Sequence, residues 1–291
     1  MNQVMKKIER IPGPLGIFIG AALWSTAGGV TKSFQMDAFL LPAIRSVIVG
    51  LFFLPFIEWK KIVWDKWLFL CILSYGALVM LVLAALRFTT ATNAIALQFT
   101  SPLWLFLFSV LVQHYRPSKK KLVPVVLITA GIVIGLCEPT VGSNTFGNIL
   151  GALGGVGLAG FTVTQKKVRT NSQAATLGLC NMGTALILFP ILLLLPQYEI
   201  VIPGNAWIYL IYLSVIESGF GYLFYMAGAA KVPSQKATTL SALELVLTPV
   251  WSFLLVRELP TIYGAISWIL ILTAILVETR LKTDAATEPT W

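Results

Sequence analysis

Charged residues are scarce in this sequence: aspartate, glutamate, lysine and arginine together make up 11% of its 291 residues. A soluble globular protein has roughly a quarter of its residues charged, because its surface has to stay hydrated. Hydrophobic residues make up 57% of the chain, and its mean hydropathy is +0.84. This composition excludes a soluble domain, a disordered chain and a coiled coil, so we expect most of the surface to face a lipid bilayer.

Cysteine and histidine are also rare, which limits the chemistry available to the chain. The cysteines are Cys71, Cys137 and Cys180, no C-x-x-C motif occurs, and His114 is the one histidine. A disulfide framework or a zinc site needs more of these residues at defined spacings. The segment GGVTKS at 28–33 lacks the glycine that precedes the lysine of a phosphate-binding loop. We therefore expect no catalytic residues, no metal site and no cofactor.

Ten long apolar runs are separated by clusters of proline, glycine and charged residues. A transmembrane helix needs about 20 apolar residues, and such clusters mark the breaks between helices. The predicted fold class is therefore an all-α polytopic membrane protein with ten transmembrane helices. The predicted spans are 14–31, 38–57, 67–86, 90–113, 122–136, 146–165, 174–195, 206–230, 237–256 and 261–277.

Lysine and arginine are distributed unevenly between the loops on the two sides of this ten-helix arrangement. One side receives 17 of the 21 residues, the other receives Lys32, Arg87 and Arg257, and Arg45 lies within the second span. Because cytoplasmic loops carry the excess of positive charge, we expect both termini to be cytoplasmic, in a multi-pass protein of the inner or plasma membrane. The net charge of +9 then reflects topology and not a nucleic-acid surface. The larger group comprises Lys6, Lys7, Arg10, Lys60, Lys61, Lys66, Arg116, Lys119, Lys120, Lys121, Lys166, Lys167, Arg169, Lys231, Lys236, Arg280 and Lys282.

The two halves of the chain weakly resemble each other. Residues 91–104 read ATNAIALQFTSPLW and residues 238–251 read TTLSALELVLTPVW, so that Pro102 aligns with Pro249. Since five is an odd number of helices, the second half would enter the membrane from the opposite side. Inverted repeats of this kind are typical of carriers that work by alternating access around a midplane site. We expect a first five-helix repeat at 1–140, a second, inverted five-helix repeat at 141–282, and a polar C-terminal tail at 283–291.

Four motifs carry a resemblance to a known family. They are LWS at 23–25, LPAIR at 41–45, AALRFTTATNAIALQFTSPLW at 84–104 and LSALELVLTPVWSFLLVRE at 240–258. With them the chain is similar, over nearly its whole length, to EamA-type members of the drug/metabolite transporter superfamily. The resemblance implies ten helices, cytoplasmic termini, and export or exchange of small organic metabolites such as amino acids. The first half departs from the family pattern, because Leu111 stands where Glu258 stands in the second half.

Three ionisable residues are predicted to lie at membrane depth: Arg45, Glu217 and Glu244. A charge at the centre of a spanning helix costs about 2.5–3.5 kcal/mol on insertion scales, so such a residue is usually paired or exposed to water. Glu217 and Glu244 lie on neighbouring antiparallel spans and could share a small space, where one carboxylate would hold a proton or bind a cation. The alternative is structural: a hydrogen bond between helices, or a pairing of one carboxylate with Arg45. Arg45 in turn either holds helices together or contacts a substrate carboxylate.

Aromatic and polar residues inside the spans complete the predicted binding site. An aromatic wall with hydroxyl groups suits an amphipathic organic solute, and a ring beside a carboxylate suits an ammonium group. Trp24 is favoured among the aromatic residues because Ser25 and Thr26 follow it. The predicted substrate-binding residues are Trp24, Ser25, Tyr75, Asn93, Gln98, Glu217, Tyr222, Ser241 and Glu244.

Glycines recur at four-residue spacing in the first helix of each half. They are Gly16 and Gly20 in the first half, and Gly147, Gly151 and Gly155 in the second. Small residues at this spacing let helix backbones approach closely in lipid, so we expect close packing there. The cations predicted to be interfacial anchors at the ends of spans are Lys32, Arg87 and Arg257.

These observations predict a secondary transporter that moves a small organic metabolite, an amino acid or a similar amphipathic solute, outward by alternating access. Uptake of a cationic or amine-bearing solute is the alternative. An integral-membrane enzyme would need clustered Asp, His or Arg residues near one membrane face, and the sequence shows no such cluster; a passive channel is the remaining class. The partners expected are the small-molecule substrate and the lipid bilayer, with protons and a homodimer left open and no nucleic acid.

Overall fold

The computed structural model describes residues 10–113, 119–137, 145–194, 200–232, 237 and 240–280. Every regular element in this part of the chain is a helix, which confirms the all-α prediction. Six of these helices are long and apolar enough to cross a membrane, and four shorter apolar helices bring the number in the described residues to the ten expected. The predicted C-terminal tail at 283–291 lies outside the described residues.

The helices follow the predicted spans, with several spans built from more than one helix. Their bounds are α2 (Gly13–Ser25), α3 (Ala27–Lys32), α4 (Leu40–Phe53), η1 (Leu54–Phe56), η2 (Trp59–Lys61), α5 (Lys66–Phe88), α6 (Ala91–Gln98), α7 (Ser101–Gln113), α8 (Lys119–Leu136), α9 (Thr145–Thr164), α10 (Gln173–Leu194), α11 (Ala206–Ile211), η3 (Tyr212–Phe220), α12 (Gly221–Ala229), α14 (Leu243–Val256) and α15 (Ile262–Arg280).

Among the spans that the sequence predicted as continuous, the first, the fourth and the ninth are interrupted in the described residues, the ninth at Ala242 just before α14. The first breaks between α2 and α3 at Thr26, whose Oγ1 donates to the Leu23 carbonyl at 2.7 Å and shares a hydrogen bond with the Tyr212 hydroxyl at 3.1 Å. The fourth breaks at Phe99 and Thr100, between α6 and α7, and Pro102 in the first turn of α7 has no backbone N–H with which to continue α6. Interrupted helices at membrane depth are found where a cavity or a binding site has to be lined.

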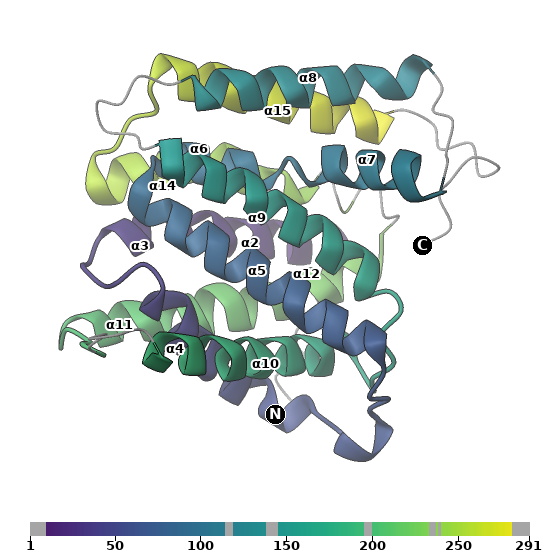
Figure 1. The fold of residues 1–291 in the computed structure, drawn as a ribbon, viewed down its shortest axis with the longest axis vertical. Coiled ribbons are helices and arrows are strands. Elements are labelled where there is room, and N and C mark those ends of the chain that lie inside the picture. Colours follow the sequence, from purple (N-terminus) through teal and green to yellow (C-terminus); the bar gives the residue numbers. More distant parts are fainter. Residues whose placement is uncertain are drawn as a thin grey trace.

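The helices cross the bundle in alternating directions and are arranged in layers (Figure 1). Helices α8 and α15 form the layer at the top of the view, α4 and α10 lie at the bottom, and α2, α5, α9 and α12 lie between them. The most extensive contacts join α5 to α9, α8 to α15, α2 to α12 and α4 to α10. Each of these pairs takes one helix from the first half of the chain and one from the second, so the two halves interlock along the whole bundle.

Glycine lets the central helices approach closely, as the four-residue spacing predicted. A Cβ atom added to Gly16 of α2 would lie 2.8 Å from the Phe224 carbonyl oxygen of α12. A Cβ atom on Gly147 of α9 would lie 2.7 Å from the backbone of Phe88. No real Cβ atom tolerates such distances, so the expected close packing is confirmed and α12 and α5 rest directly on glycine backbone.

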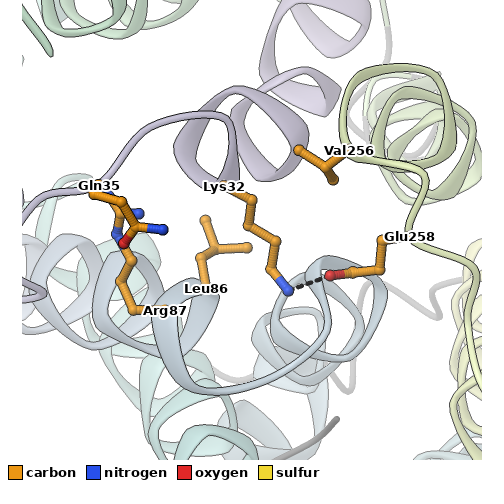
Figure 2. A pocket seen from close by; sticks show the side chains of 6 residues that line it. All are labelled: Lys32, Gln35, Leu86, Arg87, Val256 and Glu258. Carbon is orange, nitrogen blue, oxygen red and sulfur yellow. Dashed lines mark hydrogen bonds and ion pairs between the residues drawn. The ribbon is translucent and has the colours of Figure 1, made fainter. Parts of the chain in front are cut away.

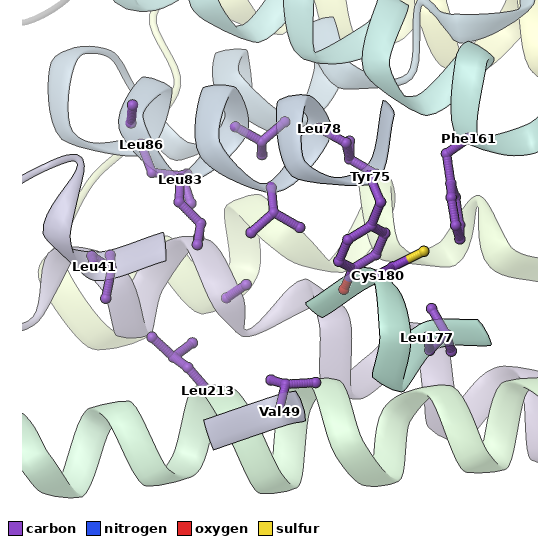
Figure 3. Close-up of a cluster of buried hydrophobic side chains, with 14 of the residues drawn as sticks. Leu41, Val49, Tyr75, Leu78, Leu83, Leu86, Phe161, Leu177, Cys180 and Leu213 are labelled. Carbon is purple, nitrogen blue, oxygen red and sulfur yellow. The ribbon is translucent and has the colours of Figure 1, made fainter. Parts of the chain in front are cut away.

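Apolar side chains fill the interior and also cover the outside of the bundle. Figure 3 shows part of the interior, where Tyr75, Phe161 and Leu213 pack among aliphatic residues of several helices. On the outside, Leu194 is 83% exposed and Leu186 is 74% exposed. A soluble protein does not leave so much large apolar surface uncovered, which agrees with the membrane environment deduced from composition.

The loops gather at two ends of the bundle, and the two ends differ in charge. In Figure 1 the loops after α3, α5 and α14 lie at the left, whereas the η1–η2 segment and the ends of α7 and α9 lie at the right. At the right the Val63 N–H donates to the Arg169 carbonyl at 3.1 Å, so loops of both halves meet there. We name this the basic end, after Lys60, Lys61, Lys66, Lys166, Lys167 and Arg169, and the opposite one the Glu258 end, after Glu258, Lys32 and Arg87.

Candidate functional site

A buried ion pair joins the two halves of the chain in the interior. The Arg45 side chain of α4 donates through Nη2 to Glu217 Oε2 at 2.9 Å, and the two side chains are 8% and 5% exposed. The same Nη2 donates to the Ser218 hydroxyl, which itself donates to Glu217 Oε2 at 2.6 Å. Three polar side chains therefore pair with one another where lipid and apolar side chains offer no partners.

The local backbone explains how Glu217 and Ser218 reach Arg45 together. Both lie in η3, a π-helical stretch of nine residues inserted between α11 and α12. A π-helix bonds residue i to residue i+5 and is wider than an α-helix, so adjacent side chains diverge less. Such insertions occur frequently at functional sites. The pairing of Glu217 with Arg45 is the structural alternative that the sequence left open for one of the two carboxylates.

Glu244 is the second carboxylate of the interior, and its situation differs. It lies in the first turn of α14 and is 8% exposed. Among the described residues, no hydrogen-bond donor or cation pairs with its carboxylate, while Glu217 and Tyr222 lie within electrostatic range of it. The structure thus brings the two predicted carboxylates near each other, and it neutralises Glu217 but not Glu244.

Tyrosine hydroxyls and an amide extend this polar cluster. Tyr75 of α5 is fully buried, and its hydroxyl accepts a hydrogen bond from Asn181 Nδ2 at 3.0 Å. Arg45 and Glu217 lie within electrostatic range of the same hydroxyl. We define the central cluster as Arg45, Tyr75, Asn181, Glu217, Ser218, Tyr222 and Glu244.

Trp24 borders the central cluster. Its ring lies 4.8 Å from the ring of Tyr222 and 4.9 Å from that of Tyr225, measured between centroids. In the described part of the chain its Nε1 has no hydrogen-bond partner. An indole with an unused donor beside two tyrosines is a wall that can contact both an apolar and a polar part of a solute.

Helices α2 and α3, on either side of the break at Thr26, both pack on α14. These helices run in the same direction across the bundle (Figure 1). A Cβ atom on Gly28 would contact Thr248 at 3.6 Å. Trp24 belongs to α2 and Glu244 to α14, so the indole and this carboxylate lie on helices that contact each other.

Other predicted binding residues lie apart from the central cluster or at its border. Asn93 is fully buried, and its Nδ2 is 3.5 Å from the Oδ1 of Asn148. The Thr89 hydroxyl donates to the same Oδ1 at 2.5 Å. The Ser25 hydroxyl forms a hydrogen bond within its own helix, donating to the Ala22 carbonyl at 2.7 Å. Those that remain are Gln98, half-buried at the end of α6, and Ser241, half-buried just before α14.

Two members of the central cluster were missed in the sequence. Asn181 is a polar residue in the mostly apolar α10, and Ser218 follows Glu217 directly. These positions could have indicated that both residues belong to the polar cluster. Neither carries a charge, and an uncharged polar residue in a span is too common to be singled out. In the residues that the structure describes, no group of three or more histidine, cysteine or acidic side chains could hold a metal ion.

A second ion pair lies at the Glu258 end, where interfacial anchors were expected. Lys32 pairs there with Glu258, and each side chain is 19% exposed. Figure 2 shows the two side chains meeting in a hollow of about 310 Å³, whose lining residues are Lys32, Gln35, Leu86, Arg87, Val256 and Glu258. Arg87 donates to the Phe34 carbonyl at 2.5 Å. Lys32 and Arg87 thus contact protein groups of the bundle in addition to any contact with the interface.

These features define the class: the chain is a multi-pass, all-helical membrane protein with a polar centre between two interlocked halves. The model of the EamA-like transporter family matches residues 11–136 and 145–279. The chain belongs to the EamA-like transporter family, as its motifs predicted.

The chain is also similar to a curated protein and to a solved structure. A protein of Archaeoglobus fulgidus, described as an uncharacterized transporter, is 25% identical over 259 residues, which cover 84% of this chain and 89% of the relative. A solved crystal structure superposes with a TM-score of 0.63 at 20% sequence identity, covering 92% of this chain and 96% of the other. The first supports a membrane transporter, and the second shows that the fold is one already seen in a crystal.

Proposed function

We propose that this protein is a secondary transporter that exports a small organic metabolite, an amino acid or a similar amphipathic solute, by alternating access. The observation that carries the proposal is the central cluster. It joins both halves of the chain at the interior, and it combines the ion pair of Arg45 and Glu217 with Glu244, whose carboxylate has no partner among the described residues. Trp24 borders it and forms an aromatic wall with Tyr222. No enzymatic activity is part of the proposal.

The inverted relation of the halves, 1–140 and 141–282, belongs to this proposal. Helix contacts support it because they exchange between the halves. Helix α2 packs on α12 as α9 packs on α5, and α14 packs on α2 as α6 packs on α9. A two-fold relation between two five-helix units would produce these pairs, and the separate match of the family model to each half agrees with it. Two equivalent halves allow one site to open to either side in turn.

The orientation follows from charge. The basic end would be cytoplasmic, with both termini, and the Glu258 end would face outward, in the inner or plasma membrane. Export then means that the central cluster loads from the basic end and releases toward the Glu258 end. The lipid bilayer surrounds the bundle, and a homodimer remains compatible with this arrangement.

The residues proposed to contact the solute are those predicted from the sequence, with roles suggested by their surroundings. An ammonium group would bind between Glu244 and the faces of Trp24 and Tyr222, since a carboxylate and an aromatic ring both attract a cation. A solute carboxylate would meet Arg45, whose Nε has no hydrogen-bond partner among the described residues. The remaining proposed contacts are Ser25, Tyr75, Asn93, Gln98, Glu217 and Ser241.

Counterflow in proteoliposomes tests the proposal. Purified protein is reconstituted, the vesicles are loaded with one unlabelled amino acid at a time, and uptake of the same labelled amino acid is measured. A carrier is accelerated by substrate on the opposite side, whereas a pore is indifferent to it. Acceleration by at least one amino acid is expected, and equal uptake with and without internal substrate for every amino acid would reject the carrier mechanism.

Uptake of a cationic or amine-bearing solute is the second candidate, and Glu244 is the observation that favours it. A carboxylate without a partner among the described residues can hold a cationic solute, or a proton that is exchanged for it. Counterflow with a monoamine such as tyramine distinguishes the candidates, since an amino acid exporter should require the solute carboxylate and an amine carrier should not.

A further inference from the structure

The carboxylate of Glu258 is held in the way a protein holds a bound anion. Its Oε2 forms the ion pair with Lys32 Nζ, and its Oε1 accepts a hydrogen bond from the Ala91 N–H at 2.6 Å. Ala91 is the first residue of α6, and the first N–H groups of a helix have no acceptor within the helix. A lysine and a helix N-terminus together make a site for an anionic group. Here the chain itself supplies that group.

An uncommon backbone conformation directs Glu258 to this position. Arg257 has φ of 57°, in the left-handed region, and is the residue that ends α14. The N–H groups of Arg257 and Glu258 donate to the Phe253 and Ser252 carbonyls at 3.0 and 3.3 Å, which closes the helix end. Glycine is the usual residue at such a position because it lacks a Cβ atom. The chain therefore reverses within one residue, and Glu258 points back to α3 and α6.

The hollow around the ion pair leaves room for a second anionic group. Its volume of about 310 Å³ matches the lower limit of small-molecule sites, which starts at about 300 Å³. Two cations, Lys32 and Arg87, and one anion, Glu258, line it together with Gln35. Positive charge is in excess there, so a carboxylate is attracted more than an amine.

Arg87 supplies donors that its own contacts do not use. One nitrogen, Nη1, donates to the Phe34 carbonyl, while Nε and Nη2 have no hydrogen-bond partner among the described residues. Asp37 lies within electrostatic range of the guanidinium, but its Oδ1 accepts from the N–H groups of Phe39 and Leu40 at the start of α4. A guanidinium with two unused N–H groups is well suited to a carboxylate.

We propose that this hollow is an outer binding site for the carboxylate group of a small organic solute. The carboxylate takes the place of Glu258 on Lys32 and on the Ala91 N–H, and Arg87 donates one of its unused N–H groups to the same carboxylate. Because Glu258 connects the ends of α14, α3 and α6, its displacement separates these helices and opens the Glu258 end. The site deepens the transport function proposed above and rests on it: it is the last site that an exported carboxylate would occupy before release.

Chemical rescue by acetate tests the site without a known substrate. The full-length variant Glu258→Ala lacks the internal carboxylate, and acetate is the smallest probe that replaces it. Relative to chloride at equal ionic strength, acetate should raise the melting temperature of Glu258→Ala by more than that of the wild-type protein, in which Glu258 competes for the site, because ligand bound to the native state shifts unfolding. Adding Lys32→Met or Arg87→Gln should weaken this rescue about tenfold in acetate concentration, the loss expected for one charge-assisted hydrogen bond.

Glu58 provides the matched control. It is also paired with a lysine, Lys61 at 2.7 Å, but its side chain is 56% exposed at the basic end. Glu58→Ala should show no difference between acetate and chloride. Equal melting temperatures of Glu258→Ala in the two salts, or rescue that survives both cation substitutions, would overturn the proposed site.

A labelling experiment covers the case in which Glu258→Ala does not fold. Val256 lines the hollow, so Val256→Cys with Cys137→Ser is reacted with a membrane-impermeant maleimide in proteoliposomes. Acetate should raise the labelling rate several-fold if it releases Glu258, and an unchanged rate would overturn the proposal. Counterflow by the wild-type protein separates the two hypotheses: a failed rescue with intact counterflow rejects the outer site alone, while absent counterflow rejects the transport function.

Discussion

In the part of the chain that the structure describes, two ion pairs connect the first half to the second, and they differ in depth and in surroundings. Arg45 and Glu217 are 8% and 5% exposed and share the Ser218 hydroxyl, whereas Lys32 and Glu258 are each 19% exposed and lie at one end of the bundle. A deep pair has given up its water and is destabilising when broken. A pair near the surface keeps part of its hydration and can exchange partners at small cost. The comparison suggests that the deep pair maintains the structure and that the end pair can change.

Removing the deep cation should have the largest effect. Arg45→Met leaves Glu217 buried and unpaired, so the free energy of unfolding should fall by about 3–5 kcal/mol. The double variant Arg45→Met with Glu217→Gln removes both charges and should recover a large part of the loss. Chemical unfolding in detergent measures both, and a double variant no more stable than the single one would contradict a structural role for the pair.

The two carboxylates of the central cluster should separate stability from transport. Glu244→Gln should lower counterflow about tenfold or more, since it removes a charge-assisted contact to the solute, and should leave the melting temperature nearly unchanged. Glu217→Gln should instead lower the melting temperature, because Arg45 loses its partner.

The pH dependence of transport provides a second readout for the same pair of variants. If Glu244 exchanges a proton, its glutamine variant should lose the pH dependence of the wild-type rate, whereas any activity retained by Glu217→Gln should keep it. Wild-type rate and pH dependence in both variants would show that the two carboxylates are structural.

Breaking the ion pair of Lys32 and Glu258 should lower the free energy of unfolding by less than breaking the deep pair. Lys32→Met should lower the free energy of unfolding by about 1 kcal/mol or less, the range for pairs that remain partly exposed. The charge exchange Lys32→Glu with Glu258→Lys should recover part of that loss, though not the hydrogen bond that Glu258 accepts from Ala91. If Lys32→Met lowered the free energy of unfolding as much as Arg45→Met, the two ion pairs would contribute equally to stability, and the proposed difference between them would be wrong.

Salt should have the smallest effect, and it should act on one pair. Raising the ionic strength from about 0.1 M to about 1 M shortens the screening length from about 10 Å to about 3 Å. The difference in melting temperature between wild type and Lys32→Met should therefore shrink in high salt, whereas the difference between wild type and Arg45→Met should persist. Equal salt sensitivity of the two differences would place both pairs in contact with water.

The fold was largely predictable because each helix is encoded locally. Apolar runs of the right length gave ten spans, and the breaks between them were visible as proline, glycine and charge. The interruption at Thr26 and the π-helical insertion at 212–220 were not predictable, because each depends on contacts with a distant helix, such as that of Thr26 with Tyr212. Close packing at Gly16 could be predicted, whereas its partner, Phe224, could not.

For the candidate site, the sequence predicted which charged residues lie in the interior, but not which of them form ion pairs. Arg45, Glu217 and Glu244 were singled out because a charge in an apolar span is costly wherever the helix lies. Which carboxylate Arg45 would neutralise depended on the packing of α4 against η3. The pairing of Lys32 with Glu258, 226 residues apart, left no trace in the spacing of either residue.

Composition and charge by themselves determined that this chain lies in a bilayer, which of its segments form apolar helices and where its basic loops gather, because transfer into lipid is a property of each segment alone. Tertiary structure decided which charges meet, which carboxylate remains unpaired and where a hollow opens. Those outcomes depend on distances of a few ångströms between helices from opposite halves of the chain, and no local stretch of residues specifies such distances.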